Sequence, residues 1–227
     1  MKRSILAALA ACLLVHPAAA AAQADLELRI IPRAGVLTPY DWFYEEFAHF
    51  GSGPLEWTEA AVLRSTLVGL TAQLELAGTG IWIRGEVLRT LGGETSVVFA
   101  ELQPASTAGP GVVLRTPYWV PTTLTIATLD LGLPTAFSLP LGIQPYVTAG
   151  IGAKRYGFDH SVLADADTHL VRPEEGVNLV TNIGGGFTAP VFRDLGIDFL
   201  ARDAISHYWD KMQHDIMFLV GVAWQPF

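Results

Sequence analysis

The adjacent residues Ser206 and His207 have the side chains of a nucleophile and a base, and Asp210 and His214 follow closely. A serine nucleophile needs its base within hydrogen-bond reach. Neighbouring residues of a β-strand, however, point to opposite faces of the sheet. We therefore predict no catalysis, and a lipid-modifying esterase stays as an alternative function.

A second group of candidate ligands lies in an acidic stretch that could bind a metal ion. Hard cations take several oxygen ligands, but the stretch has neither EF-hand nor HExxH spacing. We interpret it as a hydrated surface loop, and we predict no metal and no cofactor. The residues concerned are Asp159, His160, Asp165, Asp167 and His169.

Six charged residues interrupt segments that otherwise alternate between large apolar and smaller or polar side chains. Each falls on the face opposite the large apolar side chains. If that face encloses a narrow interior, the opposite charges must be paired, because an unpaired buried charge is costly. The pattern predicts a polar network that fills a lumen, with a narrow solute path as the alternative. The six residues are Glu75, Arg84, Glu86, Asp130, Asp198 and Arg202.

Eight segments with two-residue periodicity would position these side chains. Such alternation is typical of β-strands with one face in an apolar medium. Hydrophobic residues make up 51% of the chain and charged residues only 16%. After residue 24 no uninterrupted apolar run approaches 18 residues, so we expect no transmembrane helix. The segments are 26–37, 60–76, 81–89, 123–133, 144–156, 177–189, 195–202 and 213–227.

The connections between these strands alternate in length. We expect short turns near 77–80, 138–142 and 189–194, and long connections near 38–57, 92–121, 158–175 and 204–213. Within the first long connection, DWFYEEF favours one helical turn. The second reads as a hairpin with Pro, Gly and Ser at its tip.

An even number of strands with long loops at one end and tight turns at the other resembles the eight-stranded outer-membrane barrels of the OmpA, OmpX and OmpW type. The resemblance implies an all-β, antiparallel, up-and-down transmembrane β-barrel in the outer membrane of a Gram-negative cell. It also implies outer-membrane lipid as the surrounding medium. The role would be structural, adhesive or that of a small-molecule conduit, with the oligomeric state left open.

The C-terminal strand carries the most regular alternation, with Phe218, Val220 and Val222 on one face. It ends near an aromatic residue, as the last strand of outer-membrane barrels does. By this resemblance, Trp224 and Phe227 are the expected assembly signal read by the barrel-assembly machinery. Pro226 separates them and places Phe227 out of phase with the apolar face.

Residues 1–24 have the features of a secretory signal peptide. Lys2 and Arg3 precede an apolar core, and the small residues Ala22 and Ala24 fit a cleavage site. We expect a mature barrel domain at 25–227, beginning at Asp25, without the single cysteine. Because Lys2 and Arg3 are removed with the signal peptide, the mature chain would contain 12 basic and 22 acidic residues. This balance argues against a nucleic-acid partner.

One further alternative is a soluble periplasmic barrel that binds an apolar ligand. Its large apolar side chains would point inward, whereas those of a membrane barrel point outward. The direction of the apolar face therefore separates the two classes.

Overall fold

The computed structural model describes residues 26–40, 44–49, 55–103, 111–137, 139–163, 175–208 and 211–225. Eight antiparallel strands in these ranges close into a ring, in the order β4-β1-β11-β10-β9-β8-β7-β5, with β5 returning to β4. The predicted fold class is confirmed. The strands are β1 (Leu26–Tyr40), β4 (Ser65–Leu76), β5 (Trp82–Leu91), β7 (Val112–Pro134), β8 (Gln144–Phe158), β9 (Gly176–Phe192), β10 (Leu195–Tyr208) and β11 (Lys211–Trp224).

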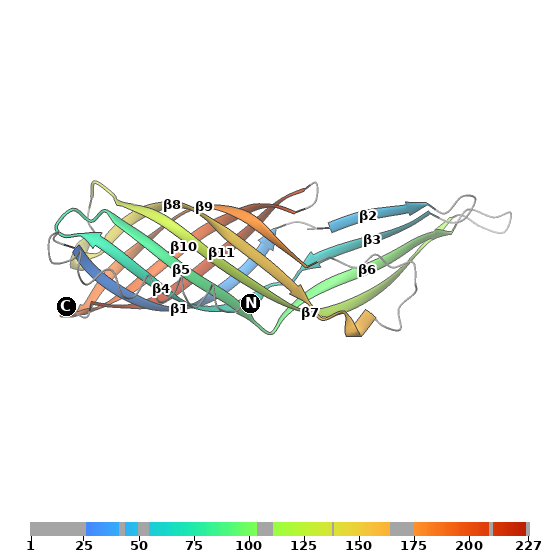
Figure 1. The fold of residues 1–227 in the computed structure, drawn as a ribbon, viewed down its shortest axis with the longest axis horizontal. Coiled ribbons are helices and arrows are strands. Elements are labelled where there is room, and N and C mark those ends of the chain that lie inside the picture. The colour runs from blue at the N-terminus through green and yellow to red at the C-terminus, as the bar shows by residue number, and fades with distance from the viewer. Residues whose placement is uncertain are drawn as a thin grey trace, which may run out of the picture.

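The strands are staggered, so that a row of paired residues spirals around the barrel. The row starts at Leu28 on β1, passes Leu74 and Ile83, and crosses the remaining strands to Ile216. It returns to β1 at Thr38, ten residues beyond its start. Closing a sheet requires such a shear together with tilted strands, and Figure 1 shows the tilt.

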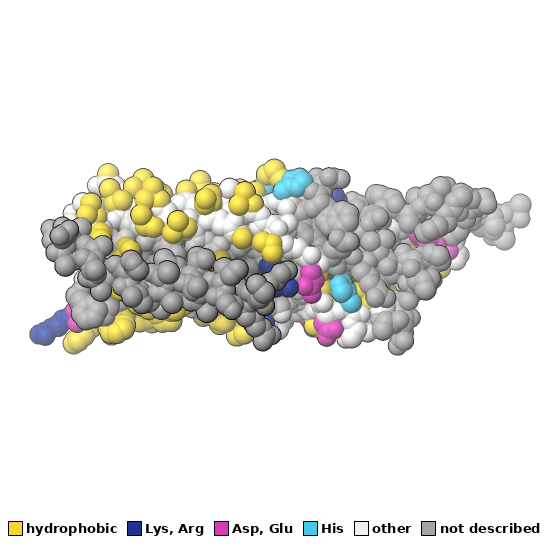
Figure 2. Space-filling view, in the orientation of Figure 1, with side chains coloured by type: hydrophobic (Ala, Val, Ile, Leu, Met, Phe, Trp, Pro, Cys, Tyr) yellow, Lys and Arg dark blue, Asp and Glu magenta, His cyan; other side chains and the backbone are white. Residues whose placement is uncertain are grey.

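Large apolar side chains cover the outward face of the ring strands. On β11, Val220 and Val222 are 42% and 50% exposed, whereas Leu219, directly before Val220, is 3% exposed. Figure 2 shows hydrophobic side chains across the visible outer wall, with charged side chains gathered near the two ends of the barrel. This is the arrangement of a barrel whose outer surface contacts lipid. It is the opposite of the arrangement expected for the soluble barrel.

Three more strands extend the wall beyond one end of the ring (Figure 1, right). They are β2 (Tyr44–His49), β3 (Leu55–Val62) and β6 (Gly93–Gln103), and they pair in the order β2-β3-β6-β7. We call these three strands, together with residues 112–121 of β7, the projecting sheet. The helical turn expected at DWFYEEF is wrong for residues 44–47, which form a strand. Residues 41–43 lie outside the described residues.

The projecting sheet continues barrel strands, which the sequence reading took as long connections. β5 and β6 both pair with β7 and are joined at Gly92, whose φ of 63° suits glycine. The predicted hairpin within 92–121 is confirmed, but its second arm and the strand predicted at 123–133 are one strand, β7. The connection predicted at 204–213 is also mostly strand, because Tyr208 pairs with Lys211. Pairing across the sheet outweighed the local loop composition.

Short connections lie at the opposite end, which we call the short-turn end. They are the turn at 77–80, the 3₁₀ segment η1 (Pro140–Gly142) and the residues between β9 and β10. The start of β1 and the end of β11 lie there too, since Ile30 pairs with Trp224. A second 3₁₀ segment, η2 (His160–Leu163), follows β8 and buries Leu163. Within the described ranges, no helix is both long and apolar enough to cross a membrane.

The outward face of β11 generates a paired test of the register. Val220→Arg would place a charge on the lipid side, at a cost of roughly 2–4 kcal/mol near mid-membrane. Leu219→Arg would point into the lumen, where Asp198 on the neighbouring strand is close in register to Leu219. We expect the folded fraction, measured by heat-modifiable gel mobility, to fall further for Val220→Arg. A greater loss for Leu219→Arg would contradict the register.

Candidate functional site in the barrel lumen

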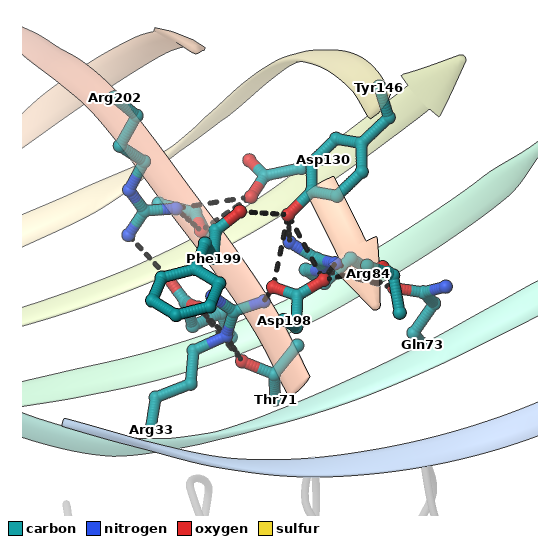
Figure 3. Close-up of polar contacts among 12 residues, drawn as sticks. Arg33, Thr71, Gln73, Arg84, Asp130, Tyr146, Asp198, Phe199 and Arg202 are labelled. Carbon is teal, nitrogen blue, oxygen red and sulfur yellow. Dashed lines mark hydrogen bonds and ion pairs between the residues drawn. The ribbon is translucent and has the colours of Figure 1, made fainter. Parts of the chain in front are cut away.

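The six charged residues singled out from the sequence are all buried inside the barrel. Their exposed fractions range from 0% for Arg84 to 7% for Glu75. They come from β4, β5, β7 and β10, so they reach the lumen from different sides of the ring. Five of them meet in one cluster with Arg33 of β1, and the sixth, Glu75, lies apart. We call Arg33, Arg84, Glu86, Asp130, Asp198 and Arg202 the central network (Figure 3).

Glu86 lies between two arginines that come from other strands. Arg33 Nε is 3.1 Å from Glu86 Oε2, and Arg202 pairs with the other carboxylate oxygen. The Thr71 hydroxyl donates a hydrogen bond of 2.8 Å to Glu86 Oε2. Glu86 therefore links β1, β5 and β10 across the lumen.

Asp198 accepts contacts from four side chains. Arg33 Nη2 is 2.5 Å from Oδ1, and Arg84 Nη2 is 3.3 Å from Oδ2. The Tyr146 hydroxyl donates at 3.0 Å and the Thr188 hydroxyl at 3.1 Å. These bonds satisfy the carboxylate from several directions, as a buried charge requires.

Asp130 closes the network on the β7 side. Arg202 Nη1 lies 3.2 Å from Asp130 Oδ2, and Asn182 Nδ2 donates to Oδ1 at 2.8 Å. Arg84 also donates to Gln73 at 2.7 Å, and its guanidinium lies 4.1 Å from the ring centre of Trp82. Three arginines thus meet three carboxylates, and the central network carries no net formal charge.

Glu75 lies nearer the short-turn end, where it pairs with Arg29 at 3.0 Å. Cavities of about 370 and 180 Å³ open at this end, the larger lined in part by Glu75 and the smaller by Arg29. They form a shallow mixed-charge vestibule outside the central network.

A further charged group, which we call the Lys154 cluster, lies elsewhere in the lumen. Lys154 Nζ is 2.5 Å from Asp215 Oδ2 and 3.1 Å from Gln213, to which the Tyr156 hydroxyl also donates. The sequence reading missed this cluster and Arg33. The signal was present for Lys154, because it continues the phase of Thr148, Gly150 and Gly152 in the alternation of that strand. Arg33 likewise continues the phase of Arg29 and Ile31.

Glycines make room for the central network at points where a larger residue would collide with it. A Cβ at Gly150 would lie 2.0 Å from Asp130 Oδ1, and one at Gly184 would lie 2.5 Å from Arg202 Cβ. The inward glycines therefore have a packing role in the lumen. The glycines whose added Cβ would meet a lumen side chain, given in parentheses, are Gly132 (Trp82), Gly150 (Asp130), Gly184 (Arg202), Gly186 (Tyr146) and Gly221 (Arg33).

Beyond the central network, toward the projecting sheet, the interior is largely apolar and encloses the Lys154 cluster, since Lys154 pairs in register with Ile126. Buried side chains from opposite walls fill this zone and continue into the projecting sheet. Eight strands leave a lumen that side chains can fill, and here ionic and apolar layers fill it in turn. The apolar layer includes Leu37, Leu67, Leu88, Leu124, Ile126, Val180, Tyr156, Phe158, Leu163, Val97 and Val120.

The structure separates the residues considered for ester hydrolysis. Ser206 is buried on the inward face, while its neighbour His207 is exposed. His214 Nδ1 instead lies 2.7 Å from Asp203 Oδ2, and both residues are partly exposed. The two side chains lie on opposite faces of β10, so His207 cannot act as the base for Ser206.

For metal binding, the described residues contain no group of three or more His, Cys, Asp or Glu side chains suited to an ion. Asp165, Asp167 and His169 lie outside those residues. Of the expected assembly signal, Trp224 ends β11 on the outer wall and is 50% exposed. Phe227 also lies outside the described residues.

No family model matches the sequence, and no curated protein matches it. Among solved structures, the outer membrane protein OprG from Pseudomonas aeruginosa matches with a TM-score of 0.52 at 12% identity, over 88% of this chain and 95% of that one. Neisserial surface protein A matches with a TM-score of 0.46 at 10% identity, over 87% and 96%. Ail of Yersinia pestis gives 0.42 at 12%, over 88% and 99%. The similarity to OprG supports the barrel fold.

Replacing Glu86 tests the energetic weight of the central network. Glu86→Gln keeps the shape but leaves Arg33 and Arg202 short of a counter-charge, and breaking a buried pair costs about 3–5 kcal/mol. The matched control is Glu175→Gln, which breaks a pair whose side chains are 48–64% exposed. Such a pair contributes at most about 1 kcal/mol. Urea unfolding in micelles measures both. A Glu86→Gln effect as small as the control's would contradict the assigned role.

Proposed function

We propose that this protein is a non-catalytic outer-membrane β-barrel with a closed lumen, which anchors the projecting sheet at the cell surface in a structural or adhesive role. The observation that carries the proposal is the filled interior. The central network and the apolar layer lie one above the other, and each draws side chains from opposite walls of the barrel.

Three features support a place in the outer membrane. The outer wall is apolar over the ring strands, which suits lipid. The fold is similar to that of a protein named as an outer membrane protein. Residues 1–24 have the pattern of a signal peptide. In this proposal β11, with Trp224 and Phe227, is the strand that the barrel-assembly machinery recognises.

The filled interior favours an anchor over a conduit. A solute path would need either a continuous polar channel or an apolar one. The charged network would oppose an apolar solute, and the apolar layer would oppose an ion, which loses its hydration there. Both barriers would have to rearrange before a solute could pass.

The projecting sheet has a surface suited to contact with other molecules. Val112 and Leu114 are 52% and 46% exposed on one face of β7, and Val113 and Trp119 are 44% and 56% exposed on the other. Among the described residues, positions 112–121 of β7 pair with β6 and with no strand on the other side. Exposed apolar side chains grouped on a sheet mark interaction sites. The barrel would hold this surface away from the membrane.

Planar-bilayer recording tests the closed lumen. We expect purified wild-type protein to give no reproducible channel steps. Arg84→Ala and Asp130→Ala, made separately, should also stay closed, because the apolar layer remains in place. Defined openings in the wild type that change in conductance with either substitution would contradict the closed lumen.

Cysteine labelling on intact cells tests the membrane placement and orientation. The mature chain is expected to lack cysteine, so Leu114→Cys and Thr79→Cys each provide one thiol, at opposite ends of the molecule. A membrane-impermeant maleimide should label Leu114→Cys on intact cells and Thr79→Cys only after lysis. The reverse pattern would invert the orientation, and labelling of neither on intact cells would contradict surface display.

A further inference from the structure

Arg89 points outward from β5 within the apolar outer wall. Its neighbours Leu88 and Thr90 are buried inside the barrel, while Val87 and Leu91, on the same outward face, are 52% and 54% exposed. The arginine is thus bracketed by lipid-facing side chains. Among the described residues, no side chain forms an ion pair or hydrogen bond with it. Charged side chains in such positions are rare, expensive and functional.

Arg155 lies close to Arg89 on the same face of the wall. Arg89 pairs in register with Thr125 of β7, and Thr125 pairs with Arg155 of β8. Two strand spacings separate the arginine backbones by about 10 Å, which two long side chains can bridge. The Arg155 side chain is 64% exposed, and its ion-pair partner among the described residues is the exposed Glu175, at 3.1 Å. Two guanidinium groups therefore flank one hydroxyl.

Apart from the exposed carboxylate of Glu175 beside Arg155, no described side chain forms an ion pair with either arginine. Arginine binds phosphate with two parallel hydrogen bonds, and its planar fork suits this better than lysine does. Two arginines match the double charge of a phosphate monoester. By contrast, a zwitterionic headgroup would bring its own cation toward them.

The surroundings favour a lipid phosphate over a free ion. Leu129, four residues beyond Thr125 on β7, is 56% exposed on the same face. Val87 of the neighbouring strand β5 is also exposed there and pairs in register with Ala127, which lies between Thr125 and Leu129. Acyl chains would lie against these side chains while the headgroup meets the arginines. A free anion gains nothing from an apolar wall.

We propose that Arg89, Thr125 and Arg155 form a binding site on the outer wall for the phosphate monoester headgroup of a membrane lipid. This inference rests on the membrane placement in the proposed function. The site would hold a lipid from the leaflet nearer the projecting sheet. It would also provide Arg89 with the counter-charge that the described protein residues do not supply.

Lipid retention by the purified full chain, folded in maltoside detergent, tests the site. Phosphatidic acid is the probe, and diacylglycerol with the same acyl chains is its match without phosphate. Native mass spectrometry measures the lipid retained. We expect the wild type to retain phosphatidic acid, and the Arg89→Gln/Arg155→Gln double variant to retain at least tenfold less. Arg193→Gln, an exposed arginine at the short-turn end, should match the wild type.

Further arms separate the possible sources of binding. Equal retention by the double variant, equal loss in Arg193→Gln, or equal retention of diacylglycerol would overturn the proposal. So would displacement of the lipid by inorganic phosphate at equal concentration, which indicates a free-anion site. If the double variant fails the heat-modifiable mobility test for folding, the Arg89→Lys/Arg155→Lys variant replaces it. That variant should retain severalfold less phosphatidic acid than the wild type, and unchanged retention would overturn the assignment of the arginine forks.

Because retention is measured in detergent, its outcome is independent of the cell-labelling result. A protein that fails surface labelling but retains phosphatidic acid through both arginines would refute the proposed function and keep the site. A protein that is labelled as expected but ignores the headgroup would do the reverse.

Discussion

The ion pairs of Glu86 with Arg33 and Arg202 are the interaction on which the arrangement of the lumen depends. In a closed barrel each strand residue faces either the surroundings or the interior, and there is no third position for a charge. Glu86 lies on β5, while its partners lie on β1 and β10. Each ion pair therefore spans the lumen, and the three strands must keep their relative register for all the charges to stay paired.

The same requirement explains the small residues of the facing strands. The interior of an eight-stranded barrel is too narrow for large side chains from every strand at one level. Gly184 and Gly150 bring their backbones close to Arg202 and Asp130. The glycines on β8 and β9 thus complement charges on β7 and β10. Large charged residues on some strands and glycine on others are two parts of one packing solution.

The sequence predicted the ring because its signal is repeated in every strand. Alternation assigned Glu86 and Arg202 to the inward face, but it could not show that they touch, since pairing depends on how the sheet closes. Arg33 was missed beside Pro32, where the reading of the strand weakened, although Ile31 and Arg33 both lie inward. In the projecting sheet, the hairpin within 92–121 was predicted, but β2 and the start of β3 were read as a long connection. The residues of this sheet show no membrane-type alternation, because consecutive residues are buried on its strands, such as Glu59 and Ala60 on β3 and Val97 and Val98 on β6.

The ionic and apolar layers of the interior have different consequences for the two ends of the molecule. Near the short-turn end, paired charges close the barrel and leave an open vestibule around Glu75 and Arg29. Toward the other end, apolar side chains such as Leu88 and Leu124 form one buried cluster with Val97 and Val120 of the projecting sheet. The sheet therefore shares its core with the barrel. An extension built on a shared core stays fixed relative to the membrane-facing wall, whereas one joined by a polar linker would move freely. This continuity is why β7 can extend beyond the ring and, together with β3 and β6, still present a defined surface.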